Sequence, residues 1–304
     1  MRATATLDWY GCATFRLVLP GEREDGRDLV VFLDAYVDRV PGAAGPGLRA
    51  EDIDRADWAV IGHSHFDHLW GAERIARQTG ATVVGSHESV RILDGEGVPT
   101  AQLLPVAGGE RIRIGRETHV SVFPSLHSCV WSHQGMAQAH EVCLGDLRVD
   151  WHGRQARMGD LFSWVASLGD ETRAHLRASD QGARGDGGAF VYLFETPQGS
   201  LLYQDTSGHW SGILQDLRPD VAILAAAGRG NVDGEPVQGS LAQFVARQAS
   251  LLKPGRVVLG HHDDWLPGFS VATDTKPIRE ELGRWLPRCE LVETGYLAAL
   301  EVFG

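Results

Sequence analysis

Short apolar runs alternate with stretches of helical spacing along most of the chain. Residues 57–62 predict a buried strand, and residues 69–80 carry apolar side chains on one helical face. Repeated alternation of this kind is typical of an α/β fold, in which helices cover the faces of a sheet. Further strands are predicted at 4–9, 14–19, 29–33, 81–84, 111–114, 120–123, 190–194, 200–204, 221–224, 256–259 and 297–302, and further helices at 87–93, 241–252 and 276–285.

The strongest chemical signal lies between the strand at 57–62 and the helix that follows it. Residues 63–68 read HSHFDH and hold three of the 13 histidines in 304 residues. His63 and His65 are two apart, so in extended backbone they point to the same side and can bind one metal ion. Asp67 and His68 follow as the chain turns into the helix, and they can reach a second metal position.

Imidazole and carboxylate ligands suit Zn²⁺, Mn²⁺ or Fe²⁺, and no thiolate is needed. The alternative interpretation is a polar turn whose histidines cap the helix or lie at the surface. The pattern H-x-H-x-D-H between a buried strand and a helix is far more specific than a lone histidine, so it favours a metal site.

This stretch resembles the H-x-H-x-D-H signature of the metallo-β-lactamase superfamily. The resemblance implies an α/β fold built as a four-layer αββα sandwich, with a metal site of one or two ions between the two sheets. The start of the chain, W-x-G-x-A-x-F-x-L followed by a strand that ends at Asp34, is also similar to this family. Asp34 could orient a metal-binding histidine from behind, or it could be an ordinary turn carboxylate at a strand end.

The other ligands that the resemblance implies occur in the expected order. His127 follows a predicted strand and matches the third histidine of the family. Asp205, in the stretch QDTSG, matches the aspartate of G-D-T-G, which bridges both metal ions in the family. His261, in GHHDDW, matches the H-W-D-D-F stretch of the branch related to ascorbate-phosphate lactonases, with His262 where Trp is common. The implied ligand set is therefore His63, His65 and His127 for the first ion and Asp67, His68 and His261 for the second, with Asp205 between them.

The implied activity is hydrolysis by a dinuclear metal centre, with Zn²⁺ favoured and Mn²⁺ or Fe²⁺ also suited. A metal ion lowers the pKa of bound water to about 7, which makes hydroxide available to attack an ester-type bond. Asp67 is the expected catalytic residue, because it could orient the hydroxide and pass its proton to the leaving group. His209, shortly after Asp205, is a weaker candidate for proton transfer or substrate contact.

Residues 129–188 depart from the compact pattern of the family. We interpret them as an insertion that forms a lid or rim of the active site within a single domain, 1–304. Asp160 is expected to cap a helix, and most apolar residues after it, such as Phe162, are expected to pack the insertion against the body. His133 and His152 are candidate substrate contacts.

The substrate class depends on the charges near the ligands. The sequence has no glycine-rich phosphate loop and no cluster of Lys or Arg near the ligands, and Arg229 is the one nearby cation that we single out. His262 and Asp264 are further candidates for substrate contact. A small neutral or singly charged ester, such as a lactone, therefore fits better than a multiply charged phosphate, although a phosphodiester stays open. An iron-dependent redox enzyme on the same fold and a non-catalytic metal-binding protein are the alternatives.

Bulk composition excludes several other classes. A formal net charge of −12 argues against nucleic acid as a partner. The sequence contains no run of 18 apolar residues, so stable membrane insertion is not predicted. The start of the chain shows no signal-peptide core, and the four cysteines have no C-x-x-C spacing, so we expect a reduced, cytoplasmic protein. One disulfide between Cys129 and Cys143 stays open, as does a homo-oligomer.

Overall fold

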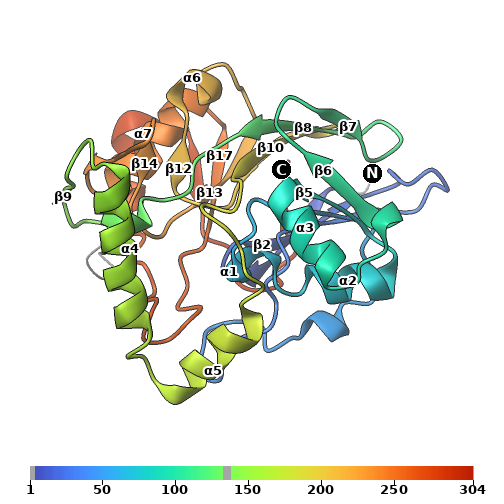
Figure 1. Ribbon diagram of the computed structural model, residues 1–304. Helices are drawn as coiled ribbons and strands as arrows, with labels where there is room; N and C mark the ends of the chain where they lie inside the picture. The colour runs from blue at the N-terminus through green and yellow to red at the C-terminus, as the bar shows by residue number, and fades with distance from the viewer. Residues whose placement is uncertain (1–3, 133–137, 304) are drawn as a thin grey trace.

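Two large β-sheets form the centre of the computed structural model, which describes residues 4–132 and 138–303 (Figure 1). The first sheet has the order β19 (Leu300–Glu301), β1 (Thr6–Gly11), β2 (Thr14–Leu19), β3 (Leu29–Leu33), β4 (Trp58–Val60), β5 (Thr82–Ser86) and β6 (Leu103–Val106). The second has the order β18 (Glu290–Val292), β17 (Arg256–Gly260), β13 (Val221–Ala225), β11 (Gly199–Gln204), β10 (Phe190–Thr196), β8 (His119–Pro124) and β7 (Arg111–Arg113). Each sheet is part antiparallel and part parallel, with parallel pairing from β3 to β6 and from β11 to β18.

The two sheets share one apolar core, and helices cover their outer faces. In β3, Val31 points into the core between the sheets, whereas Phe32 points to the helices outside. In β13, Ile223 likewise points into the core between the sheets, and Leu224 points to the helices outside. Burial on both faces explains why these strands read as continuous apolar runs. The expected four-layer αββα sandwich is confirmed.

Helices occupy three regions of the molecule. The first sheet is covered by α1 (Phe66–Leu69), α2 (Ala72–Thr79) and α3 (His87–Gly95), and the second by α6 (Ser211–Leu214), α7 (Leu241–Leu252) and α8 (Lys276–Trp285). The insertion contributes α4 (Trp151–Val165) and α5 (Asp170–Ser179). Short 3₁₀ turns lie at Ala50–Asp52, Thr100–Gln102 and Val130–Ser132, and small strand pairings join β12 (Gly208–His209), β14 (Asn231–Val232) and β15 (Glu235–Pro236), and β9 (Cys143–Leu144) with β16 (Gln238–Gly239).

The predicted helix at 69–80 is observed as α2, which begins only at Ala72, because Gly71 separates it from the preceding short helix α1. Gly71 has a φ of 116°, and a Cβ there would collide with the backbone oxygen of Ala35. The break lets the carbonyl of His68 accept a hydrogen bond of 2.8 Å from the backbone N–H of Ala35. The end of α1 is thus attached to the segment that follows β3.

The insertion also differs from expectation. α4 begins at Trp151, where the side chain of Asp150 accepts a hydrogen bond of 2.8 Å from the backbone N–H of Gly153. Asp160 lies inside this helix, so the prediction that it caps a helix is wrong. Residues 151–159 show no apolar period that predicts a helix. This agrees with the structure, in which no residue of α4 is buried. The expected packing against the body is observed for Trp164, whose ring lies 5.6 Å from that of Phe269, but not for Phe162, whose side chain is 63% exposed.

Two strands of the large sheets escaped prediction, as did the two-residue strands β9, β12, β14, β15 and β16. β6 contains Pro105 and β18 begins with the exposed Glu290, and both lie at sheet edges, where proline and charge are tolerated. The four cysteines are all free, so the disulfide left open between Cys129 and Cys143 does not form. Among the helices of the described ranges, none has the length and apolar character needed to cross a bilayer.

We expect the start of α7 to depend on its capping box. The Oγ of Ser240 accepts a hydrogen bond of 3.2 Å from the backbone N–H of Gln243, whose side chain accepts one of 3.0 Å from Ser240. Ser240→Ala should therefore lower the free energy of unfolding by about 1 kcal/mol, measured by urea denaturation. Ser250→Ala in the last turn of the same helix is the control, and an equal loss in both variants would contradict the capping role.

Candidate metal centre

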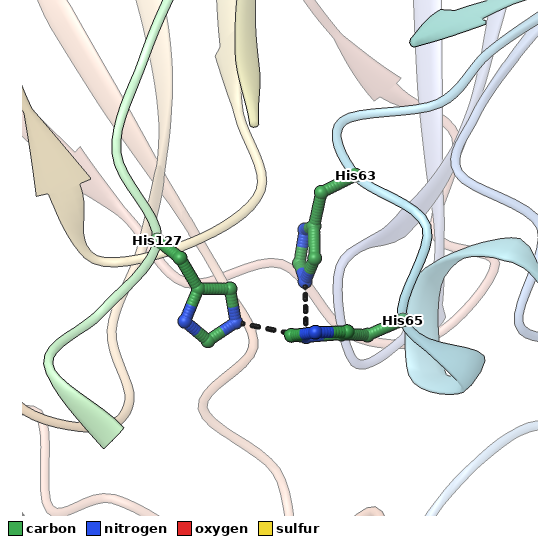
Figure 2. A group of neighbouring side chains, drawn as sticks. All are labelled: His63, His65 and His127. Atoms are coloured by element: carbon green, nitrogen blue, oxygen red, sulfur yellow. Dashed lines mark hydrogen bonds between the residues drawn. The ribbon is translucent and has the colours of Figure 1, made fainter. Parts of the chain in front are cut away.

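Three histidines from both sheets converge on one point. His63 and His65 lie between β4 and α1, and His127 lies beyond the end of β8 (Figure 2). Nε2 of His63 is 3.1 Å from Nδ1 of His65, which is 3.1 Å from Nε2 of His127. Nitrogens bound to one tetrahedral zinc ion at 2.0–2.1 Å would lie about 3.3 Å apart. The three nitrogens are therefore spaced as ligands of a single cation are.

The other ring nitrogen of each histidine faces an acceptor. Nδ1 of His63 is 2.5 Å from Oδ2 of Asp205, Nε2 of His65 is 3.0 Å from the carbonyl of Gly185, and Nδ1 of His127 is 2.9 Å from the carbonyl of Ser128. Because these acceptors require a donor, the ring proton sits on that side of each imidazole. The nitrogens that face one another then carry lone pairs. Three lone pairs at this distance, with no proton among them, are the arrangement that a bound cation stabilises.

The protonation of these histidines agrees with that arrangement. Burial lowers the pKa of His63 well below its usual value, and the neighbouring imidazoles of His68 and His65 lower it further. Burial also lowers the pKa of His127 well below its usual value, and the neighbouring imidazoles of His63 and His65 lower it further. Both rings are therefore neutral at pH 7, which is the form that binds a metal ion.

A second group forms beside the first around Asp67. Oδ2 of Asp67 is 3.4 Å from Nε2 of His261 and 3.5 Å from Nε2 of His68. Burial raises the pKa of Asp67, but His68 and His261 outweigh it and hold that pKa well below its usual value. The buried thiol of Cys12 also lies within 4.8 Å of the ligand atoms of Asp67 and His261. Cys12 was missed by sequence reasoning, because it lies far from both residues along the chain.

Asp34 holds His68 in place. Its Oδ2 is 2.6 Å from Nδ1 of His68, and its Oδ1 accepts a hydrogen bond of 2.8 Å from the backbone N–H of Gly62. Burial lowers the pKa of His68, but Asp67 and Asp34 raise it well above its usual value. Nδ1 thus donates to Asp34, and the Nε2 proton lies toward Asp67, where a cation would replace it. Of the two interpretations of Asp34, the contact with a cluster histidine is the one observed.

Asp205 lies on the far side of His63. Its Oδ2 is 2.5 Å from Nδ1 of His63 and 3.3 Å from Nδ1 of His68, so it contacts one histidine of each implied ligand set. These three residues form a further group that could hold a metal ion, and the bridging role implied by the resemblance stays a prediction. The space behind the cluster is narrow, since a Cβ at Gly62 would collide with this carboxyl group. Burial raises the pKa of Asp205 to about 6. Among the described residues its buried Oδ1 has no hydrogen-bond partner, which leaves one acceptor for a cation or a proton.

The expected proton-transfer residue His209 is not part of the cluster. It is fully buried, its ring lies 5.3 Å from that of Phe244, and neither ring nitrogen has a hydrogen-bond partner. Burial lowers its pKa to about 4. This position beneath α7 corrects the expectation that His209 contacts substrate.

The expected substrate contacts are scattered. His262 stacks on Trp9 at 4.4 Å, so it lies apart from the ligands, whereas its neighbour His261 joins them. Asp264 accepts a hydrogen bond of 2.7 Å from the Oγ of Ser270, which engages it within its own loop. The remaining candidates are Arg229, which is buried beside the segment after His127, His152, which is exposed on α4, and His133, which lies outside the described residues.

The insertion touches the first group directly. After α5 the chain returns over the cluster, where Gly185 contacts His65 and the carbonyl of Gly187 accepts a hydrogen bond of 3.2 Å from the backbone N–H of Ser64. Within α5, Nε2 of His175 is 2.7 Å from the hydroxyl of Tyr36. Residues at the end of the insertion therefore help to orient a ligand.

Comparison with known proteins agrees with this architecture. Residues 30–180 match the model of the β-lactamase superfamily domain. A UPF0173 metal-dependent hydrolase from Pyrobaculum arsenaticum is 32% identical over 121 residues, which are 40% of this chain and 49% of that protein. The chain thus spans about half the length of the curated relatives it matches.

Solved structures show the same fold over nearly the whole chain. Igni18, a metallo hydrolase from the archaeon Ignicoccus hospitalis, has a TM-score of 0.60 and 15% identity, covering 98% of both chains. The metallo-β-lactamase fold protein YhfI from Bacillus subtilis has a TM-score of 0.54 and 10% identity, covering 96% of both chains. At these identities the likeness concerns the fold alone.

We expect Asp34→Asn to weaken metal binding without removing a ligand. The amide keeps an oxygen for Gly62 but presents a donor to Nδ1 of His68, which moves the ring proton to Nε2. Affinity for a divalent metal ion should fall by about 10–100-fold, measured by competition with a chromophoric chelator. Asp38→Asn is the matched control, because Asp38 is also buried but contacts Ala50 and Arg74 instead. Equal affinities in the two variants would refute this role of Asp34.

We expect His127→Ala to lower the metal content by about one ion per chain, since it removes one of three converging nitrogens. The measurement is elemental analysis of the purified variant. His152→Ala should keep the wild-type metal content, because His152 is exposed on α4. Loss of metal from the His152 variant, or none from the His127 variant, would overturn the grouping.

Proposed function

This chain belongs to the metallo-β-lactamase superfamily, and we propose that it is a hydrolase that binds two divalent metal ions. The observation that carries the proposal is the pair of adjacent ligand groups, to both of which residues 63–68 contribute. His63 and His65 face His127 at one position, and Asp67 faces His261 at the other. Relatives that match part of the chain are named metal-dependent hydrolases, which supports this activity.

His63, His65 and His127 would hold one ion, and Asp67, His68 and His261 would hold the other. Bound cations supply Lewis acidity and lower the pKa of coordinated water to about 7. Imidazole-rich ligation favours Zn²⁺, with Mn²⁺ or Fe²⁺ as alternatives. Asp205 orients His63 through Nδ1, and Asp34 orients His68 in the same way.

Asp67 is the residue that we assign to proton handling. Its carboxylate is ionised at neutral pH, because His68 and His261 hold its pKa far down. It also lies at the border between the two groups. With Oδ2 facing the second position, Asp67 would take a proton from the attacking water at its other oxygen, Oδ1, and deliver it to the leaving oxygen.

The substrate that we propose is a small neutral or singly charged ester, with a lactone favoured over a phosphodiester. A pocket of about 460 Å³ is lined by Arg39, Trp70 and His175, among others. Its two cations are Arg39, whose Nη2 donates a hydrogen bond of 3.1 Å to the carbonyl of Tyr10, and Arg49, which pairs with acidic neighbours. Because carboxylates already neutralise one of these cations, the pocket fits one negative charge better than several. The helix α5, which carries His175, would act as a rim of this pocket.

Metal analysis and a substrate panel test the proposal together. The protein purified without added metal should contain about two zinc or manganese ions per chain and should hydrolyse lactones or phosphodiesters. A chelator should abolish this activity, and added Zn²⁺ should restore it, since the metal ions activate the water. Asp67→Asn should lower kcat by about 10²–10⁴-fold, as expected for loss of a general acid–base group. A protein that binds no metal, or one that binds iron and shows a redox-dependent spectrum without hydrolysis, would refute the proposal.

A further inference from the structure

We propose that the sulfur of Cys12 is a ligand of the second metal ion, together with Asp67 and His261. The inference rests on the metal centre of the proposed function and adds a residue and a ligand type to it. The three residues come from three distant parts of the chain and are all buried. None of the other three cysteines belongs to a group of this kind among the described residues.

The three side chains are close enough to share one ion, since their ligand atoms all lie within 4.8 Å of one another. Sγ of Cys12 lies 3.5 Å from Nε2 of His261. With Zn–S of about 2.3 Å and Zn–N of about 2.05 Å, sulfur and nitrogen on one zinc ion lie about 3.5 Å apart. Oδ2 of Asp67 lies 3.4 Å from the same Nε2, and the corresponding oxygen–nitrogen separation is about 3.4 Å. Sγ of Cys12 also lies 3.7 Å from Nδ1 of His261, so the imidazole would have to rotate for Nε2 and Sγ to reach the same ion.

The backbone holds the thiol at this distance. The N–H of Cys12 donates to Oδ1 of Asp263 at 3.0 Å, and its carbonyl accepts from the N–H of His261 at 2.6 Å and from the indole N–H of Trp9 at 2.9 Å. Cys12 and His261 have positive φ angles of 49° and 61°. Such conformations persist in residues other than glycine only where surrounding contacts enforce them. The turn after β1 and the segment after β17 are therefore locked to each other at the two proposed ligands.

Binding requires the thiol to lose its proton. Burial raises the pKa of Cys12 well above its usual value, as does Asp67, while Arg39 opposes them. A coordinated cation reverses this preference, because the S–H bond breaks, a bond to the metal forms and the proton passes to solvent. A soft sulfur ligand also makes this position favour zinc over manganese. If Cys12 served only as a small apolar residue beside Tyr36 and Trp265, it would change neither the spectrum nor the affinity of a bound metal ion.

Cobalt substitution tests the proposal directly. The protein loaded with Co²⁺ should show a thiolate-to-cobalt charge-transfer band in the near ultraviolet. Cys12→Ser should lose this band and bind one of its two ions at least about tenfold more weakly, in line with removal of a metal ligand. Cys129→Ser is the matched control, because Cys129 is also fully buried but joins no ligand group, and it should keep both the band and the affinity. Circular dichroism establishes that each variant is folded.

A triple variant keeps the test decisive if Cys12→Ser does not fold. With Cys129, Cys143 and Cys289 all replaced by serine, Cys12 is the only source of a thiolate band, which should persist. Two bound cobalt ions without the band in the wild-type protein would refute coordination by Cys12 and leave the metal centre intact. Persistence of the band in folded Cys12→Ser would refute it in the same way. Failure to bind cobalt at all would instead refute the proposed function.

Discussion

The packing of the two sheets against each other determines the position of every candidate ligand. His63 and His65 follow a strand of the first sheet, while His127 and His261 follow strands of the second. Residues such as Val31 and Ile223 fill the space between the sheets and exclude water from it. Since dense apolar packing resists small displacements, the strand ends keep a constant separation. Metal binding needs ligand atoms placed to within tenths of an ångström, and this core supplies that precision.

Hydrogen-bond acceptors behind the histidines determine which ring nitrogen of each histidine is available to a metal ion. Asp205, Gly185, Asp34 and Ser128 each contact the ring nitrogen that faces away from the cluster. These contacts determine which nitrogen carries the proton, and so they direct the lone pairs inward. Two of the four acceptors are buried carboxylates with pKa values of about 6, which burial has raised. Burial of a charged carboxylate is unfavourable, but the imidazoles beside these two groups offset that free energy, and a bound cation would offset it further.

The second position shows how the ends of the chain complete the site. Cys12 belongs to the first turn of the chain and His261 to a segment 249 residues later, yet their backbones are joined by a 2.6 Å hydrogen bond. Asp263 strengthens this junction through the backbone N–H of Cys12 and the hydroxyl of Tyr296. The insertion adds a third contact at Gly185, so the centre draws on the beginning, the middle and the end of the chain.

The sequence by itself determined most strands and helices outside the insertion and the place of the cluster at a strand end, because apolar period and ligand spacing are local properties. It also indicated that His127, Asp205 and His261 follow strands. Only the tertiary structure decided that Asp205 lies behind His63, that His209 is enclosed beneath α7, and that Cys12 meets His261. These are relations between residues far apart in the chain, and they depend on how the two sheets pack and on which rotamers the remaining space allows. Apolar periodicity and ligand spacing describe neighbours along the chain, so they carry no information about how the two sheets pack or which rotamers fit between them.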